Sequence, residues 1–247
     1  MTMRHPFLIL LGGLLLVCSP LAAQEKNAEK TVAAWYRDNK RAAAYVHIRA
    51  EITAIVARSD ASRVPPDTLI DMLDEAVSKG APAADIVAAL EKRAGELIAL
   101  KVFLDGSRAC LAGNKGVAED DSVDSAEMLR CCALFLRRGI TRDIIENVLR
   151  EACARGKNFT AALDALRTIA NIPSLGEIPA EKVVALGNAV LGSGLSPSGY
   201  TSLSSIYIKG KLKNINAAEV TDIIIAALRA GKGLIRIEQE LNRRREP

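Results

Sequence analysis

Residues 124–156 read DSAEMLRCCALFLRRGITRDIIENVLREACARG, and this stretch decides the fold class. It contains two segments of similar length, which are closed by Gly139 and Gly156. Counted back from either glycine, the residues 11, 8, 7, 4 and 3 positions earlier are apolar. This spacing places them on one face of an amphipathic helix. The stretch therefore predicts two short helices joined by a tight turn.

The same spacing recurs along the chain. It precedes Gly80, Gly194 and Gly231, and it precedes Gly210 in a weaker form. We expect each closing glycine at the C′ position of its helix, because a left-handed backbone costs glycine least. The residues 15 positions before five of these glycines suit helix starts, and they are Pro65, Asp124, Thr141, Pro179 and Asn216. Starts and ends together therefore define several short helices.

The repeated helices predict an all-α fold of stacked short helical hairpins, an α-solenoid-like array, after an N-terminal signal peptide. A hairpin of this size cannot bury its own apolar face, so hairpins must stack on one another. The expected division is a signal peptide over residues 1–23, an N-terminal helix region over 24–62 and a helical-hairpin repeat domain over 63–247.

Further helical segments complete the expected fold, and the last of them follows Gly231 and contains Leu234, Ile237 and Leu241. One N-terminal helix over roughly residues 28–58 precedes the hairpins. The second helix of the first hairpin runs from Pro82 to about Gly95. Apolar stretches over residues 97–111 and 159–169 predict two more helices, which we interpret as insertions after the first and second hairpins.

The first 23 residues have the layout of a secretory signal peptide. Arg4 precedes the apolar run Phe7–Val17, and Ala22-Ala23 forms a small-residue cleavage site. The run is too short to span a membrane, so no transmembrane segment is expected in the mature chain. These features predict a secreted or periplasmic bacterial protein that starts at Gln24. Lipid anchoring at Cys18 is the alternative, because lipoprotein signals end at a cysteine.

The charge balance is mild. The chain carries 33 basic and 29 acidic side chains, and loss of the leader removes only Arg4 from these sets. The positive run Arg243–Arg245 is interpreted as a solvated helix end. Proteins that bind nucleic acids concentrate far more positive charge, so no nucleic-acid partner is expected.

The mature chain keeps four cysteines, Cys110, Cys131, Cys132 and Cys153. All four fall on apolar positions of their helices, where a free thiol packs as a small hydrophobic residue. Buried free thiols are therefore the preferred interpretation, and one native disulfide is the alternative in an exported protein. A bridge between Cys132 and Cys153 would be strained, because a tight hairpin separates them by roughly 7–8 Å along the helix axis.

No residue pattern indicates catalysis, a cofactor or a metal ion. His47 is the only histidine left in the mature chain, and we expect it on the polar side of the first helix. The acidic run Glu119–Asp121 lacks the alternating ligands of a calcium loop. We therefore expect a non-enzymatic protein without a cofactor. A cell-envelope enzyme without a recognisable motif is the alternative.

Trp35, Tyr36 and Tyr45 are the candidate partner-binding residues. They cluster in the N-terminal helix region, and aromatic side chains are enriched at the centres of protein interfaces. The alternative is that they dock this region onto the repeats. The sequence thus predicts an exported scaffold that binds a protein or peptide.

Overall fold

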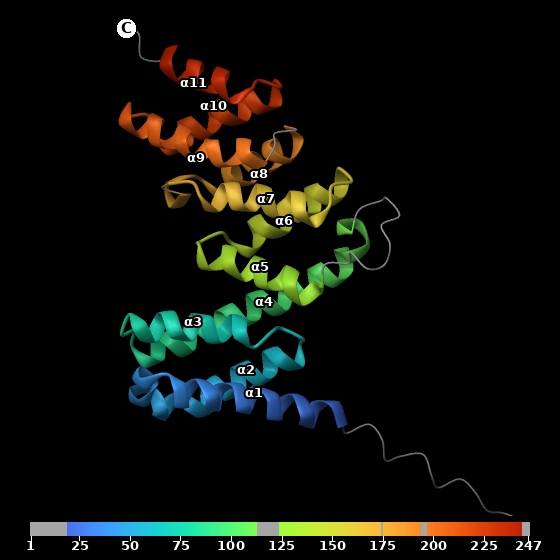
Figure 1. Cartoon of the computed structure of the whole chain (residues 1–247), viewed down its shortest axis with the longest axis vertical. Helices are drawn as coiled ribbons and strands as arrows, with labels where there is room; N and C mark the ends of the chain where they lie inside the picture. The colour runs from blue at the N-terminus through green and yellow to red at the C-terminus, as the bar shows by residue number, and fades with distance from the viewer. Residues whose placement is uncertain (1–18, 113–123, 174, 194–196, 244–247) are drawn as a thin grey trace, which may run out of the picture. The chain divides into compact units, whose positions relative to one another are not determined.

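The structure is a computed structural model, and it describes residues 19–112, 124–173, 175–193 and 197–243 (Figure 1). Within these ranges every regular element is a helix and no strand occurs, which confirms the all-α prediction. By the contacts among its residues the chain forms two compact units, Met1–Gly95 and Glu96–Pro247. We call them unit 1 and unit 2 and describe each by itself.

Unit 1 contains three α-helices, a 3-10 helix and the first part of a fourth α-helix. They are α1 (Ser19–Asp38), η1 (Lys40–Ile48), α2 (Arg49–Ala61), α3 (Asp67–Ser78) and the beginning of α4 (Ala83–Leu111). Helix α1 packs against α2 and η1, and α3 also contacts η1. The 3-10 helix therefore lies at the centre of the contacts within this unit.

The prediction of one helix over residues 28–58 is wrong. Helix α1 ends at Asp38, and Asn39 adopts an extended backbone with φ −97° and ψ 103°. The side chain of Asn39 accepts a hydrogen bond from the backbone N–H of Arg41, so it caps the next helix instead of continuing the last one. Residues 37–41 are all polar, so the apolar helical period is interrupted where the structure places the break.

The predicted helix end near Gly95 is also wrong, because α4 continues through this residue as one helix of 29 residues. Glycine inside a helix costs only about 1 kcal/mol relative to alanine. Leu90, Ala94 and Leu97 on either side are fully buried, and this burial favours the continuous helix.

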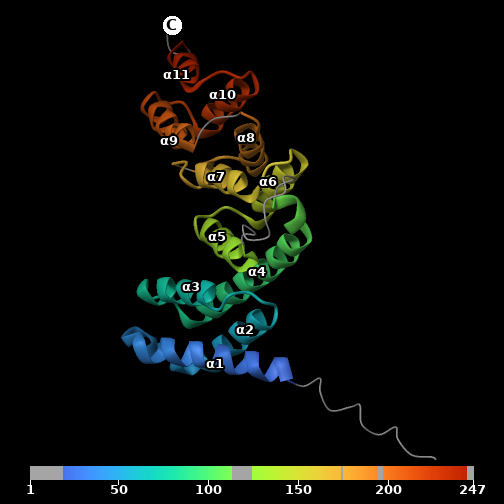
Figure 2. The same ribbon diagram turned by 45° about the vertical axis from the view of Figure 1, so that its right-hand side comes forward.

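Unit 2 holds the remaining helices in two rows. They are α5 (Ser125–Arg137), α6 (Arg142–Ala154), α7 (Phe159–Ala170), the short η3 (Leu175–Glu177), α8 (Ala180–Gly192), α9 (Pro197–Leu212), α10 (Ala217–Arg229) and α11 (Leu234–Arg243). Helix α8 packs between α6 and α10 in one row, while α5, α7, α9 and α11 contact one another in sequence in the other (Figure 2). Helix α7, predicted as an inserted helix, thus lies between α5 and α9 in their row.

Four of the closing glycines have the predicted left-handed backbone. The φ angles are 68° at Gly80, 86° at Gly139, 63° at Gly156 and 66° at Gly231. At Gly139 the next residue donates its N–H to the carbonyl of Phe135 at 3.1 Å, which is the bond of a Schellman motif. Gly194 lies outside the described residues.

The prediction for Gly210 is wrong. Helix α9 runs past this residue to Leu212, and Asn214 takes the left-handed position with φ 55°. Gly210 instead lies directly against Val220 of α10, where a Cβ atom would collide with the valine side chain. Its small size therefore serves the packing of two helices and not a helix end.

The predicted N-caps agree with the structure at three positions. Asp124 accepts a hydrogen bond from the N–H of Ala126 at 3.1 Å, and Asn216 accepts one from Glu219 at 2.8 Å. Thr141 accepts a longer one of 3.4 Å. These caps satisfy N–H groups that have no partner inside the helix.

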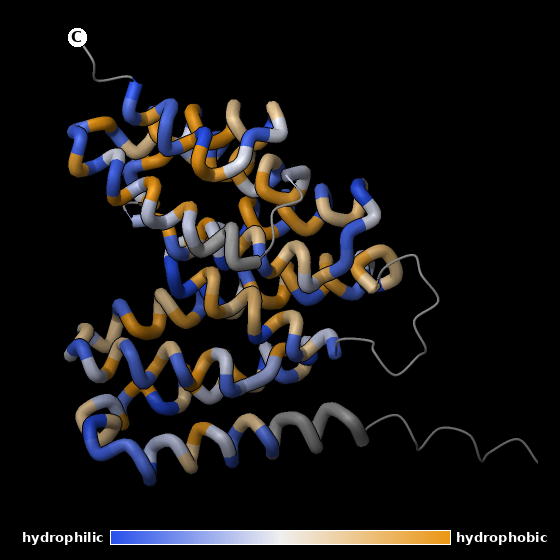
Figure 3. The backbone as a smooth tube through the Cα atoms, turned by 45° about the horizontal axis from the view of Figure 1, so that its top comes forward, coloured by the Kyte–Doolittle hydropathy of each residue, from blue (hydrophilic) through white to orange (hydrophobic). Residues whose placement is uncertain are grey.

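Apolar and polar residues alternate along the helices within about one turn, as the colours of the tube show (Figure 3). Leu149 in the middle of α6 is fully buried, as the apolar spacing predicts. The next residue, Arg150, is exposed and lies over the ring of Phe103, 5.6 Å from its centre. Amphipathic helices therefore build the core of unit 2 mainly from aliphatic side chains, together with a few aromatic ones such as Phe159.

Candidate binding site

Trp35 of α1 joins three segments of unit 1. Its side chain is buried, with 6% of its surface exposed. The indole Nε1 donates a hydrogen bond of 2.6 Å to Oδ1 of Asp74 on α3, and Nδ2 of Asn39 donates one of 2.8 Å to the same oxygen. One carboxylate oxygen thus holds the end of α1 and the start of η1 against α3.

The two tyrosines continue this connection. The hydroxyl of Tyr36 donates to the carbonyl of Tyr45 at 2.9 Å, and the hydroxyl of Tyr45 donates to the carbonyl of Ala81 at 2.9 Å. The Tyr36 ring meets Trp35 edge to face, and the Arg49 guanidinium lies 5.4 Å from its centre. Burial raises the pKa of Tyr36, and Arg49 partly opposes this effect.

All three candidate aromatic residues therefore make contacts within unit 1. For Trp35 and Tyr45, which bond to Asp74 and Ala81, this is the docking role that the sequence offered as the alternative, whereas Tyr36 bonds to Tyr45 inside the N-terminal region. Contact with a partner by Trp35, Tyr36 or Tyr45 stays a prediction. Unit 1 has two hollows, which lie toward the two ends of η1.

The first hollow lies beside Trp35 at the start of η1. Its volume is about 560 Å³, and its lining is Trp35, Asp38, Asn39, Lys40, Arg41, Asp74 and Ser78. Arg41 donates a hydrogen bond of 3.1 Å to the carbonyl of Ser78 near the end of α3. The hydrogen bond from Arg37 lowers the pKa of Asp38. The side chains that line this hollow carry charges of both signs.

The second hollow is an open groove of about 710 Å³ between α1, η1 and α2, which we call the alanine groove. Its lining is Glu29, Val46, His47, Arg49, Ala50, Thr53, Ala54 and Ala57. The alanines leave space, and Val46 exposes more than half of its side chain there. Glu29, His47, Arg49 and Thr53 add charged or polar groups beside the alanines and Val46. This combination suits an extended or helical segment with apolar side chains.

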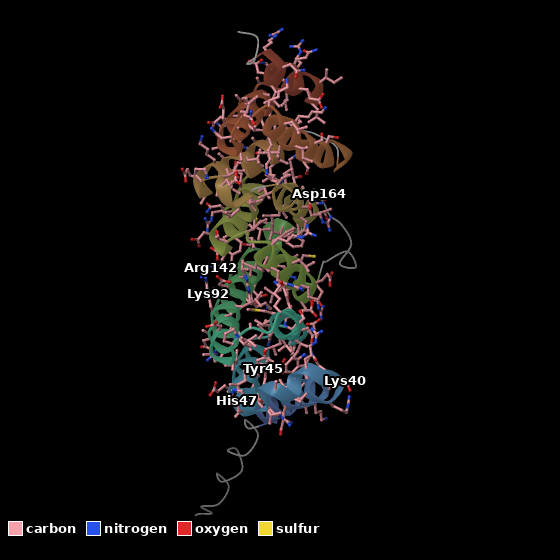
Figure 4. The ribbon with its side chains drawn as sticks, turned by 90° about the vertical axis from the view of Figure 1, so that its left-hand side faces the viewer. Lys40, Tyr45, His47, Lys92, Arg142 and Asp164 are labelled. Carbon is pink, nitrogen blue, oxygen red and sulfur yellow. A yellow bond between two sulfur atoms is a disulfide. The ribbon has the colours of Figure 1, made fainter. Side chains whose placement is uncertain are left out.

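His47 is exposed at the end of η1, in agreement with its expected polar position. In Figure 4 it appears on the opposite side of unit 1 from Lys40, which lines the first hollow. In that view Lys40 thus marks the first hollow, and His47 marks the alanine groove.

The cysteines correct the sequence interpretation. Cys110 near the end of α4 and Cys153 near the end of α6 form a disulfide, with their Cα atoms 5.3 Å apart. The preferred interpretation of four buried free thiols is thus wrong for this pair, and Cys110 is exposed. Cys131 and Cys132 are free. Burial raises the pKa of both, so these thiols resist forming the reactive thiolate.

The described residues contain no group of three or more His, Cys, Asp or Glu side chains that could hold a metal ion. The acidic run Glu119–Asp121 falls outside them, as does Cys18. Among the helices that the structure describes, none is both long and apolar enough to cross a membrane.

Sequence reasoning missed Asp74 and the alanine groove. Asp74 occupies an exposed position of α3 next to the buried Leu73, where a carboxylate is ordinary. Its role depends on Trp35, which lies 39 residues earlier in the chain. The groove likewise depends on how α1, η1 and α2 meet. A close reading of residues 46–57 could have found only the run of small side chains.

Comparison of the chain with protein-family models, with curated protein sequences and with solved structures finds no match.

Proposed function

We propose that this chain is an exported, non-enzymatic helical-repeat protein of the bacterial envelope that binds a protein or peptide segment. The alanine groove carries this proposal, because it is the larger of the two hollows of unit 1 described above and offers apolar contact area. Its polar residues, Glu29 and Arg49, can fix the direction of a bound segment.

Export is supported by two independent features. The leader over residues 1–23 has the charged, apolar and small-residue parts of a signal peptide. The disulfide between Cys110 and Cys153 fits a compartment in which thiols are oxidised. Attachment of a lipid at Cys18 remains the alternative form of the exported protein.

A solenoid-like stack of two-helix repeats is supported by the rows of unit 2. Arg155, Gly192 and Arg229, at the ends of α6, α8 and α10, line one small pocket of about 220 Å³. The step between successive members of this set is 37 residues in both cases. We therefore assign α6–α7, α8–α9 and α10–α11 as three successive repeats.

The test blocks the groove. Peptides are selected from a random display library against the chain that starts at Gln24, and their binding is then measured by fluorescence anisotropy. Ala54→Trp should weaken binding of the selected peptides at least tenfold, because the indole projects into the groove and occupies part of it. Ala88→Trp is the matched control, since Ala88 is an exposed alanine on α4 that does not line the groove.

Failure to select any peptide would contradict the proposal. Equal binding to both tryptophan variants would also contradict it. Circular dichroism confirms that each variant folds before binding is compared.

A further inference from the structure

Apolar side chains that face solvent gather on two neighbouring helices of unit 2. Ile208 and Leu212 of α9 are 51% and 77% exposed, and Ile235 of α11 is 75% exposed. Ile208 and Leu212 are four residues apart, so they share one face of α9. Exposed large aliphatic residues on adjacent helices indicate an interaction surface.

Helices α9 and α11, which carry these residues, contact each other. Nζ of Lys209 contacts Oε1 of Glu238 at 2.7 Å, and Lys213 bonds to the side chain of Asn242. Both links join residues that are 29 positions apart. The two helices therefore run parallel and in register, and Ile235 lies one turn before Glu238 beside α9.

Cations surround these apolar side chains. Lys211 follows Ile208 by three residues and Lys209 precedes Leu212 by three, so lysines flank the apolar face of α9 on both sides. Arg236 stands next to Ile235. We call Ile208, Leu212 and Ile235 with the neighbouring Lys209, Lys211, Lys213, Lys232 and Arg236 the α9–α11 surface.

Carboxylates are rare around this surface. Residues 182–218 and 223–237 contain no Asp or Glu. Glu238 is paired with Lys209, and Asp222 is paired with Lys182 at 2.6 Å. Glu240 is the other acidic residue of α11. In contrast, the arginines of α6 are balanced by neighbouring acids, since Arg142 and Arg150 both contact Glu146. The small positive surplus of the chain is therefore concentrated here.

We propose that the α9–α11 surface docks on an anionic lipid bilayer. Lysines and arginines attract anionic headgroups, while protruding aliphatic side chains enter the boundary between headgroups and acyl chains. The three aliphatic residues are more than half exposed, so they project from the surface. A soft lipid layer accepts such projections without preformed pockets, whereas a protein partner needs matching cavities.

The proposal is independent of peptide binding, because the alanine groove lies in unit 1. Loss of lipid binding would leave peptide binding intact, and the reverse also holds. The two proposals can thus fail separately.

The test measures co-sedimentation of the chain that starts at Gln24 with vesicles. Vesicles of phosphatidylglycerol mixed with phosphatidylcholine are compared with vesicles of phosphatidylcholine alone. We expect binding to the anionic vesicles at least tenfold stronger than to the neutral ones, and we expect it to weaken as salt rises. Leu212→Glu and Ile235→Glu should each reduce the partition coefficient at least tenfold.

Val102→Glu is the matched control, because Val102 is 69% exposed on α4 but lies outside the α9–α11 surface. It should bind anionic vesicles as the unaltered chain does. Absence of binding to anionic vesicles would overturn the proposal. Equal loss in all three variants would also overturn it, as would a stable complex with an acidic protein that protects Leu212 from solvent.

Discussion

Cys110 and Cys153 are joined by a disulfide that links the end of α4 to the end of α6 within unit 2. Their separation along the chain is 43 residues, and the enclosed segment includes the whole of α5. Closing a loop of this length restricts the unfolded chain strongly. The bond therefore stabilises the region between α4 and α6 beyond its packing contacts.

Removal of this disulfide should destabilise the protein. Replacing both Cys110 and Cys153 with serine should lower the free energy of unfolding by about 2–4 kcal/mol, measured by urea titration. Addition of a reductant should destabilise the unaltered chain and leave the double variant unchanged. Thiol titration of the denatured, unreduced mature chain should find only Cys131 and Cys132. Four reactive thiols would show that the bond does not form.

Substitution by alanine should change the free energy of unfolding in opposite directions at Gly139 and at Gly95. A Cβ atom meets nothing within 4 Å at either residue, so steric overlap plays no part. Gly139 has a φ of 86°, which strains any residue with a Cβ atom, and Gly139→Ala should cost about 1 kcal/mol. Gly95 lies inside the helix α4, where Gly95→Ala should stabilise by up to about 1 kcal/mol. Urea midpoints that shift in the same direction would contradict one of these backbone assignments.

Leu149 and Arg150 test the register of α6. Leu149→Ala should cost about 2–5 kcal/mol, because it leaves a cavity in a fully buried site. From the sequence alone, an effect below about 0.5 kcal/mol is expected for Arg150→Ala. Because Arg150→Ala also removes the contact with the ring of Phe103, we expect it to lower the free energy of unfolding by about 0.5–1 kcal/mol.

A double-mutant cycle with Phe103→Leu isolates the contact between Arg150 and the ring. The loss caused by Arg150→Ala should shrink when the ring is absent. Comparable losses for Leu149→Ala and Arg150→Ala would mean that the apolar face of α6 is wrongly assigned.

Tyr207 should make stability depend on alkaline pH. Burial raises its pKa from the ordinary 10.0 to about 12 in the folded chain. The folded state thus holds the proton more tightly than the unfolded state. The stabilisation is complete below pH 10 and is lost as the pH rises from about 10 to about 12, by about 3 kcal/mol.

Tyr207→Phe supplies the control for this titration. At neutral pH it should cost about 0.5–1.5 kcal/mol, because the hydroxyl of Tyr207 lies 2.8 Å from Oγ1 of Thr221. The extra loss of stability above pH 10 should disappear in this variant. If both proteins lose stability in parallel, the ionisation of Tyr207 does not contribute.

The mature chain should begin at Gln24. Cleavage after Ala23 follows from the small residues at positions 22 and 23. N-terminal sequencing of the exported protein measures this directly. A start at a lipid-modified Cys18 would establish the anchored form instead.

Local features of the helices were predictable from the sequence. The left-handed glycines at Gly80, Gly139, Gly156 and Gly231 follow from the position of each residue after an apolar helical period. The caps at Asp124 and Asn216 follow from their side chains and spacing in the same way. These features depend on interactions within about four residues, which a single sequence contains in full.

Interactions between distant residues were decided only by the tertiary structure. Gly210 resembles a helix end in the sequence, but Val220 of α10 requires a small residue there. The pairing of Cys110 with Cys153 and the contact of Trp35 with Asp74 likewise join positions 43 and 39 residues apart. The alanine groove and the α9–α11 surface belong to this class too. An apolar period determines that a face is buried, whereas the identity of the covering element depends on the packing of all helices in the unit.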